Sequence, residues 1–195
     1  AIINIGGISN ISCIKKNKLS SFYIGPGNSL IDDLVFYFFK KNFDINGSIA
    51  FKGKINNKII KEFKKDIYFK LNYPKSLDRE YFKKYYNLLI KLKNNDSIAT
   101  ASMLTIEAIN LGIKLSNKKI KEIFLTGGGR KNIFIFKNLK KLLINKNIKV
   151  INIDKLNLNG DMLESQAFAY IAVRSYLKLP ISIPTTTGVK KPLSG

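Results

Sequence analysis

Residues 1–28 read AIINIGGISNISCIKKNKLSSFYIGPGN, and this stretch decides the fold. The run Ile2–Ile5 is short, apolar and β-branched and ends at two glycines, which is typical of a buried strand that enters a tight turn. Two further strand-like runs, 10–14 and 20–24, flank the Lys-rich segment 15–18 and predict a hairpin. The stretch therefore predicts three consecutive strands at the start of one sheet.

The rest of the chain alternates helices with short strands. Asn28, and either Asp96 or Ser97, are placed to cap two of the helices. The tail from Pro180 carries too much Pro, Thr and Gly for regular structure. This order predicts a single α/β domain over 1–195, with a mixed sheet flanked by helices. The apolar spacing predicts helices at about 28–39, 55–65, 79–93, 97–115, 132–144 and 161–177, and strands at 122–125 and 149–153.

The chain is strongly basic, with 34 Lys+Arg against 13 Asp+Glu and a formal net charge of +21. Such a charge is typical of proteins that bind nucleic acid or anionic surfaces. The excess is nearly all Lys, however, and it accompanies abundant Ile, Asn, Phe and Tyr, which are all specified by A/T-rich codons. The Lys residues are also spread over many segments. We therefore favour compositional drift, and keep a basic polyanion-binding protein as the less favoured alternative.

Several kinds of chemistry are excluded by residue counts. The sequence has one cysteine, Cys13, and no histidine, which excludes an internal disulfide, a multi-thiolate metal site and histidine-based catalysis. No apolar run approaches the length of a membrane span, and the first residues lack the features of a signal peptide. We expect a cytoplasmic protein without a membrane partner, and a chain cut from a longer one.

Three glycine-rich turns follow predicted strands, at 6–7, 25–28 and 127–129. Glycine lets the backbone adopt positive φ and lets phosphate oxygens approach amide N–H groups closely. The third turn matches neither the dinucleotide fingerprint nor the Walker loop. One such turn is weak support for a phosphate site, but three in one short α/β chain favour nucleotide binding.

The turns and their surroundings resemble segments of the anhydro-N-acetylmuramic acid kinase family. Residues 4–10 resemble its NIGGxxN segment, and residues 25–28 with Asp32 resemble its FDTGPGNxLxD segment. The other resemblances, in chain order, are DxxGxxAxxG at 44–53, PKSxxREyF at 74–82, GGGxxN at 127–132, EAxAFAxLAxR at 164–174 and PsvTGA at 184–188. The matches cover nearly the whole chain in order.

This resemblance implies a fold and an activity. The fold is that of the actin-like/sugar-kinase ATPase superfamily, in which two α/β lobes close around ATP and Mg²⁺. This chain would be the second lobe, its final helix at about 161–177 would pack toward the upstream lobe, and that lobe is absent from the sequence. The activity is hydrolysis and phosphorylation of 1,6-anhydro-N-acetylmuramic acid to N-acetylmuramic acid 6-phosphate, in peptidoglycan recycling. The implied partners are a small amino sugar and ATP, with no specific nucleic acid, and a homodimer is possible.

Site residues follow from the same resemblance. The implied nucleotide-binding residues are Gly6, Gly7, Gly127, Gly128, Gly129 and Asn132. The implied sugar-binding residues are Gly25, Pro26, Gly27, Asn28 and Glu164. No residue of this chain is implied as a metal ligand.

One position departs from the family pattern. The family places an Asp, as the base that activates water, where this chain has Tyr23. A phenol, with an ordinary pKa of about 10, is a poor base at neutral pH. Asp32 and Asp33 belong to the following helix and are not expected to replace the missing carboxylate. Two alternatives stay open: an active kinase, and a catalytically weak or silent homologue that binds nucleotide.

Overall fold

The computed structural model describes residues 1–15, 18–117 and 119–195. Its main sheet has five strands in the order β3-β2-β1-β4-β5. Strand β1 pairs antiparallel with β2 and parallel with β4, so the sheet is mixed, and the predicted fold class is confirmed. The strands are β1 Ile2–Ile5, β2 Ile8–Lys15, β3 Lys18–Pro26, β4 Glu122–Thr126 and β5 Lys149–Asn152.

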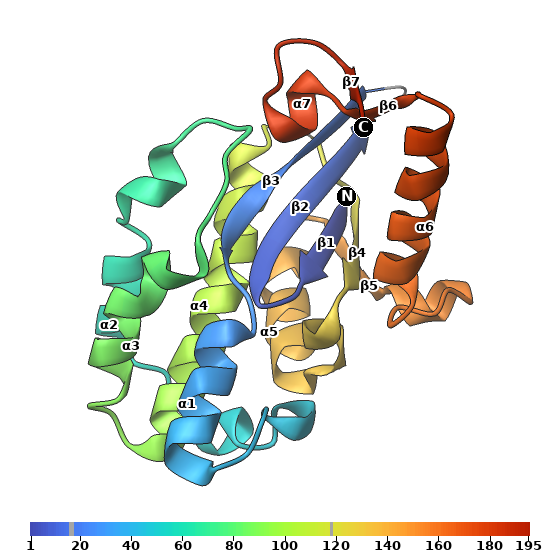
Figure 1. The fold of residues 1–195 in the computed structure, drawn as a ribbon. Helices are drawn as coiled ribbons and strands as arrows, with labels where there is room; N and C mark the ends of the chain where they lie inside the picture. The colour runs from blue at the N-terminus through green and yellow to red at the C-terminus, as the bar shows by residue number, and fades with distance from the viewer. Residues whose placement is uncertain (16–17, 118) are drawn as a thin grey trace.

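Helices surround this sheet, and α4 and α5 lie behind it in Figure 1. The α-helices are α1 Ser29–Phe39, α2 Asn57–Phe63, α3 Lys83–Leu89, α4 Asn94–Leu115, α5 Ile133–Ile144, α6 Leu163–Tyr176 and α7 Pro184–Thr187. Short 3₁₀ turns connect several of them, including 79–82 and 128–131. A small second sheet pairs β6 Pro180–Ser182 with β7 Leu193–Ser194.

The long helix α4 is the centre of the core. Most of its residues are buried, including Ile98, Leu104 and Ile109, and it packs against β2, β3, α1 and α5. At 22 residues, α4 is long and apolar enough to cross a membrane by length and composition alone. The prediction that no apolar run approaches such a length was therefore wrong. Its burial inside the fold is what a core helix of a globular protein shows.

The β2–β3 hairpin presents two different faces. Ile11, Phe22 and Ile24 are buried on the face that packs on α4. The alternate residues, among them Asn10 and Tyr23, lie on the opposite face, and the short helix α7 contacts β3 beside them. This alternation follows from the two-residue period of a strand. Residues 16–17 of the predicted Lys-rich turn lie outside the described residues.

Several helix boundaries differ from the prediction, because side chains near the ends bond elsewhere. Helix α2 begins at Asn57, because the Oδ1 of Asn56 accepts hydrogen bonds from the N–H groups of Lys58 and Ile59. The predicted helix 79–93 is divided into a 3₁₀ turn and α3. Asp96 does not cap α4, which begins two residues earlier. Its Oδ1 accepts from the Lys54 N–H at 2.7 Å instead.

The tail contains regular structure, which the prediction of an irregular segment missed. The hydroxyls of Thr186 and Thr187 donate to the Ile183 carbonyl and close the single turn of α7, which ends at Gly188 with φ +76°. The hydroxyl of Thr185 donates to the Leu19 carbonyl and attaches α7 to β3. Local side-chain bonds therefore order a segment whose composition alone argued against order.

Helix α6 stands at the side of the sheet and makes few contacts with it (Figure 1). None of its residues is buried, although many residues of its sequence LESQAFAYIAVRSY are apolar. Phe168, Val173 and Tyr176 are among its largely exposed side chains. Within the described chain, the apolar side chains of α6 therefore have no protein layer over them.

Candidate functional site

The first two glycine turns are bonded to each other. Gly6 and Gly7 follow β1, and residues 27–29 follow β3. The Asn28 N–H donates to the Gly6 carbonyl at 2.7 Å, and the N–H groups of Gly27 and Ser29 donate to the Gly7 carbonyl at 3.0 and 3.1 Å. A Cβ on Gly27 would lie 2.2 Å from the Gly6 oxygen, so only glycine allows this approach. Two motifs twenty residues apart thus form one backbone unit.

The third glycine turn packs against the end of β1. Gly127 has φ +73°, and a Cβ there would lie 2.4 Å from the Asn4 Oδ1. A Cβ on Gly129 would lie 2.2 Å from the Ile5 Cγ2. Gly128 has more room, because the nearest atom to its Cβ position is the Asn28 Nδ2 at 3.5 Å. The turn therefore has ordinary van der Waals contact at its middle residue and close packing on both sides.

Asn28 connects the two ends of this arrangement. Its Nδ2 donates to the Ile5 carbonyl at 3.2 Å, and its side chain lies beside Gly128 and Gly129. Asn28 is the N-cap residue of α1, as predicted, but its side chain makes no capping hydrogen bond to this helix. The amide is occupied by the β1 carbonyl instead. Asn28, implied by sequence as a sugar contact, thus lies among the residues implied for the nucleotide.

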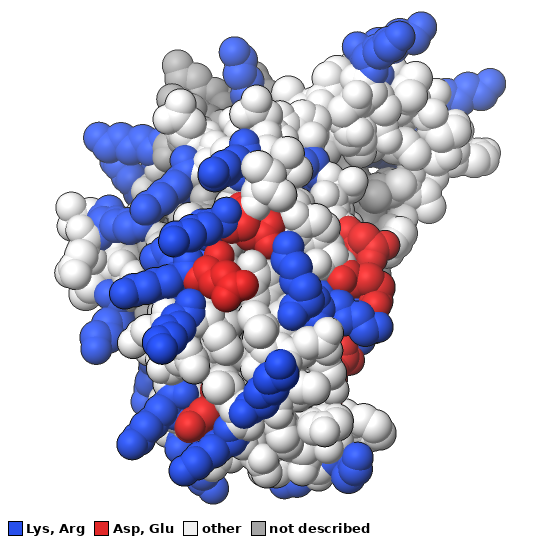
Figure 2. Space-filling view, turned by 90° about the vertical axis from the view of Figure 1, so that its left-hand side faces the viewer, with Lys and Arg blue, Asp and Glu red and all other residues white. Residues whose placement is uncertain are grey.

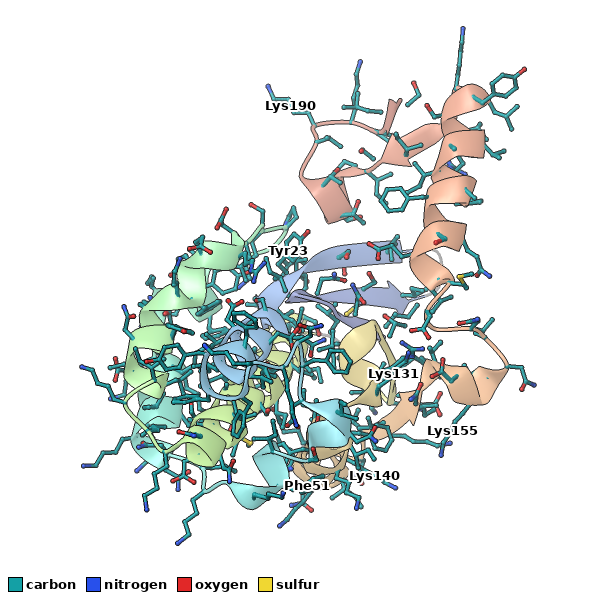
Figure 3. All side chains as sticks on the ribbon, turned by 60° about the horizontal axis from the view of Figure 1, so that its bottom comes forward. Tyr23, Phe51, Lys131, Lys140, Lys155 and Lys190 are labelled. Atoms are coloured by element: carbon teal, nitrogen blue, oxygen red, sulfur yellow. The ribbon has the colours of Figure 1, made fainter. Side chains whose placement is uncertain are left out.

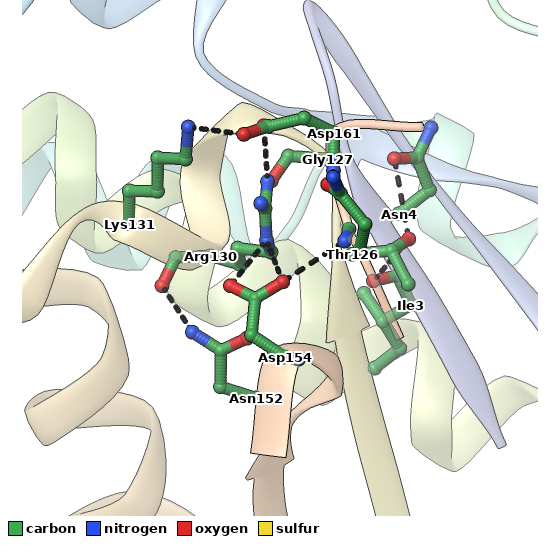
Figure 4. A network of polar contacts seen from close by, with 11 residues as sticks. Ile3, Asn4, Thr126, Gly127, Arg130, Lys131, Asn152, Asp154 and Asp161 are labelled. Carbon is green, nitrogen blue, oxygen red and sulfur yellow. Dashed lines mark hydrogen bonds and ion pairs between the residues drawn. The ribbon is translucent and has the colours of Figure 1, made fainter. Parts of the chain in front are cut away.

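Arg130 holds the glycine triad in place, and sequence reasoning missed it. Its buried guanidinium donates from Nη1 to the Gly127 carbonyl at 3.0 Å and to Asp161 Oδ1 at 2.9 Å, and from Nε to both carboxylate oxygens of Asp154 (Figure 4). Hydrogen bonds from Arg130 and Lys131 lower the pKa of Asp161 to about 2. The signal available in the sequence was an Arg directly after three glycines.

Asn132 caps helix α5. Its Oδ1 accepts a hydrogen bond from the Ile135 N–H at 3.1 Å. Asn132 is buried and lies against the loop that carries Gly47. The cap fixes the start of α5 just beyond the glycine triad, where the positive end of the helix dipole favours negative charge. The turn and the helix N-terminus together suit an anionic ligand.

Two cavities flank Gly128. One, of about 410 Å³, is lined by Asn28, Asp32, Gly128 and Asn132, together with the apolar Phe43 and Ile45. Burial, followed by the neighbouring Asp33 carboxylate, raises the pKa of Asp32 to about 7. Its carboxylate has no hydrogen-bond partner among the described residues.

The second cavity, of about 470 Å³, lies between the glycine triad and α6. Glu164, in the first turn of α6, lines it together with Asn4, Gly127 and Gly128. Asn4 is also the residue whose Oδ1 accepts from the Thr126 hydroxyl at 3.3 Å. The structure therefore places Glu164 beside the implied nucleotide residues.

Tyr23 lies in a different cavity, of about 550 Å³, formed by the open face of β2–β3, residues 74–76 and α7. Its side chain is 38% exposed, and its carbonyl accepts from the Tyr68 hydroxyl at 2.7 Å. Neither Asp32 nor Asp33 lines this cavity, and Asp33 pairs with Arg79 at 2.8 Å. Lys131 lines the cavity of Asp32, and Figure 3 shows Tyr23 well apart from Lys131.

The residues implied as sugar contacts therefore lie at different places in the structure. Gly25, Pro26 and Gly27 are buried between β3 and α1, and Pro26 lines a cavity of about 370 Å³ with Asp33 and Arg79. Asn28 and Glu164 flank Gly128 from opposite sides. The nucleotide residues, in contrast, come together at the adjoining ends of β1 and β4.

The chain is similar to known proteins in both sequence and structure. The family model of anhydro-N-acetylmuramic acid kinase matches residues 1–194. Curated proteins named anhydro-N-acetylmuramic acid kinase are 33% identical in Roseobacter denitrificans, over 100% of this chain and 53% of that protein, and 35% identical in Zymomonas mobilis, over 100% and 53%. The chain spans about half the length of the curated relatives it matches.

Two solved structures are similar to part of the chain. The activator of the 2-hydroxyisocaproyl-CoA dehydratase from Clostridium difficile, with bound ADPNP, has a TM-score of 0.47 and 15% identity over 76% of this chain and 52% of its own. Component A of the Acidaminococcus fermentans (R)-2-hydroxyglutaryl-CoA dehydratase has a TM-score of 0.48 and 13% identity over 76% and 54%. The family match spans nearly every residue, and the quoted relatives exceed 30% identity, so this chain belongs to the anhydro-N-acetylmuramic acid kinase family.

Proposed function

We propose that the full-length protein is an ATP-dependent kinase that hydrolyses 1,6-anhydro-N-acetylmuramic acid and phosphorylates it to N-acetylmuramic acid 6-phosphate. We place this reaction in peptidoglycan recycling in the cytoplasm. Family membership supports the reaction class. The observation that carries the proposal is the backbone unit formed by Gly6, Gly7 and residues 27–29 against the glycine triad. Such a unit suits phosphate groups, because glycines let them approach the backbone closely and the adjacent helix N-terminus favours negative charge.

Each glycine turn has a proposed role. Gly6 and Gly7 form the turn for the terminal phosphates, and Gly127, Gly128 and Gly129 approach the nucleoside. The apolar Phe43 and Ile45 line the cavity on that side and suit a purine base, while Asp32 offers an acceptor for hydroxyl groups. Phosphoryl transfer depends mainly on positioning and on neutralising charge, and fixed backbone dipoles contribute to both.

Magnesium fits this site only as an ion held chiefly by the nucleotide. The described residues contain no group of three or more His, Cys, Asp or Glu side chains that could hold a metal ion. Mg²⁺ commonly keeps several waters and binds through substrate phosphates with one or two carboxylates. Asp32 and Glu164, one in each cavity beside Gly128, are the residues that would contribute, directly or through water. When bound, the ion would neutralise charge on the phosphates.

We further propose that α6 packs against the other half of the full-length protein. The chain spans about half of its curated relatives, and no residue of α6 is buried. Its exposed apolar side chains, including Phe168 and Val173, would be covered by that half. The expected result is that the isolated chain associates or aggregates, while the full-length protein has a defined size by light scattering. A homodimer of full-length protein is compatible with this packing.

A specific observation favours a second candidate, a nucleotide-binding homologue with little turnover. The family's water-activating carboxylate is replaced by Tyr23, and no other carboxylate lines its cavity. The binding of nucleic acid remains the third candidate. On the face shown in Figure 2, basic side chains are scattered among acidic and neutral ones rather than gathered in a stripe, which favours diffuse and weak attraction of polyanions.

The test uses the full-length protein with ATP and the anhydro-sugar. We expect ADP and a phosphorylated sugar, and in ¹⁸O-labelled water the product gains one label, because hydrolysis adds a water oxygen. Nucleotide binding without product would select the weakly active homologue. Failure to bind ATP, together with tight and sequence-specific binding of DNA at physiological salt, would refute both nucleotide proposals.

A further inference from the structure

The cavity that contains Tyr23 has an unusual wall. Its lining residues are Asn10, Ser21, Phe22, Tyr23, Pro74, Lys75, Ser76, Thr186 and Thr187, and none of them is acidic. Each of the four other cavities described on the molecule has at least two carboxylates in its wall, such as Asp32 and Asp44 or Asp161 and Glu164. The wall at Tyr23 therefore offers hydrogen-bond donors and one positive charge, which suits an anion.

Lys75 supplies that charge, and it is half-buried. Its Nζ donates to the Tyr68 carbonyl at 2.7 Å and lies 3.9 Å from the centre of the Tyr68 ring. No described carboxylate forms an ion pair with it. Burial lowers the pKa of Lys75 to about 8, so the ammonium is still mainly charged at neutral pH.

The carboxylate of Asp66, which is bonded to Tyr68, is already occupied. The carboxylate of Asp66 accepts hydrogen bonds from Tyr81 and Tyr85 and pairs with Lys84 at 2.6 Å. Asp66 also accepts from the Tyr68 N–H, which fixes the residue that Lys75 rests on. Lys75 is thus held in position by Tyr68 while its charge remains unpaired, and a half-buried unpaired cation binds an anionic group favourably.

Three of the polar side chains in this wall, those of Asn10, Tyr23 and Ser76, are most relevant to this charge. Asn10 and Tyr23 are paired across β2 and β3, on the open face of the hairpin, and Ser76 follows Lys75 in the chain. The side chains of Asn10, Tyr23 and Ser76 make no hydrogen bond to another described residue, so all three are available to a ligand. Lys75, Asn10 and Ser76 together could donate to both oxygens of a carboxylate.

We infer that Lys75, with Asn10 and Ser76, binds the carboxylate of an acidic sugar in the Tyr23 cavity and so selects acidic over neutral amino sugars. This inference rests on the proposed function, because it takes the sugar acid as the substrate. The carboxylate of the sugar is then recognised by the Lys75 side chain, in a cavity separate from the glycine turns. Phosphate is the other anion with suitable chemistry, and the experiment separates the two.

The experiment measures binding to the full-length protein without ATP, by calorimetry or ligand-observed NMR. The ligands are N-acetylmuramic acid, N-acetylglucosamine, which lacks the lactyl carboxylate, and inorganic phosphate. In Lys75→Met we expect affinity for the acid to fall about 10- to 100-fold, the range for a lost charge-assisted hydrogen bond, while affinity for the neutral sugar changes less than about 2-fold. Lys75→Arg should retain part of the preference for the acid.

Lys155→Met is the matched control, because Lys155 is exposed and its side chain makes no hydrogen bond or ion pair with any described residue. It should leave both affinities unchanged. Equal losses for acid and neutral sugar in a folded Lys75→Met would overturn the inference, as would unchanged affinity for the acid. Phosphate binding that depends on Lys75, without preference among sugars, would also overturn it.

The outcome is separable from that of the proposed function. Acid binding that depends on Lys75, in a protein that forms no phosphorylated product, would support the inference and contradict the kinase proposal. Turnover in which Lys75→Met raises KM equally for acidic and neutral anhydro-sugars would do the reverse. A melting temperature close to that of wild type identifies the variants that are folded and fit for this comparison.

Discussion

The two sides of the site are built from different parts of the chain. On the nucleotide side, the contacts that fix the geometry join backbone to backbone, as in the bonds of Asn28 and Ser29 to the Gly6 and Gly7 carbonyls. On the Tyr23 side, the cavity wall consists of side chains from strands, a loop and α7. Compositional drift changes side chains more readily than it changes glycines held by close contacts. The nucleotide side should therefore keep its function while the sugar side is altered.

The largest expected effect comes from restoring the missing carboxylate. Full-length Tyr23→Asp should form product about 10²–10⁴-fold faster than wild type, the usual value of general-base catalysis, because a phenol accepts a proton poorly near neutral pH. Nucleotide affinity should be unchanged, since Tyr23 and the glycine triad line different cavities. Product formation and ATP affinity are measured for both proteins.

If both proteins are fully active at equal rates, another group is the base. The Tyr23 side would then have kept its function, contrary to the contrast drawn with the nucleotide side. Tyr23→Asn is the control, because it resembles Asp in size but cannot accept the proton as a carboxylate does. A rise in rate with both substitutions would indicate a steric effect of the tyrosine ring.

The next effect tests the backbone side. Gly27→Ala should lower the unfolding free energy by about 2–4 kcal/mol, because its Cβ would lie 2.2 Å from the Gly6 oxygen and 3.1 Å from the Gly7 oxygen, and both belong to backbone. Gly128→Ala should cost less than about 1 kcal/mol, since its nearest neighbour is 3.5 Å away, but should weaken ATP binding. Denaturant unfolding and nucleotide titration measure the two quantities. A stable Gly27→Ala with normal ATP affinity would contradict the rigid unit.

The sequence predicted much of this arrangement, where local rules decide it. The strand at Ile2–Ile5 and the hairpin after it follow from apolar alternation and are confirmed. Helix α5 begins beside Asn132 as expected, because an Asn before a helical run is a strong cap. The fold class and the family could therefore be predicted without coordinates.

What sequence reasoning missed depends on contacts between distant residues. The bonds that join Gly6–Gly7 to residues 27–29 have no local signature, nor does the network of Arg130 with Asp154 and Asp161. Asn28 occupies the predicted N-cap position of α1, but its side-chain amide donates to the Ile5 carbonyl and makes no capping bond. Long-range partners redirected side chains whose local role was predicted from neighbours.

The raised pKa of Asp32, a side chain on the nucleotide side, can be tested through the pH dependence of stability. Burial and Asp33 raise its pKa from 3.8 to about 7, so the native state holds this proton more tightly than the unfolded state does. Between pH of about 4 and 7 the unfolding free energy should therefore fall as pH rises. Asp32→Asn should remove this fall and be more stable at pH 8 by about 1–2 kcal/mol, after discounting for partial exposure. The measurement is denaturant unfolding of both proteins from pH 4 to 8. A difference that does not depend on pH would contradict the raised pKa.

The smallest effect is expected for Asn132. Its substitution tests whether this side chain, which lies beside the glycine triad, has a structural role or contacts the nucleotide. Asn132→Ala should lose about 1 kcal/mol of stability, because the cap bond to the Ile135 N–H disappears. Asn138→Ala is the control in the same helix, since its amide donates only to the Phe134 carbonyl and alanine favours helix interiors. ATP affinity should fall by no more than about 3-fold in Asn132→Ala, because Arg130 and Ile5 still hold the glycines. A large loss of ATP affinity at unchanged stability would mean that the Asn132 side chain contacts the nucleotide. In that case the nucleotide side would also depend on side chains, and its resistance to drift would be smaller than the backbone contacts imply.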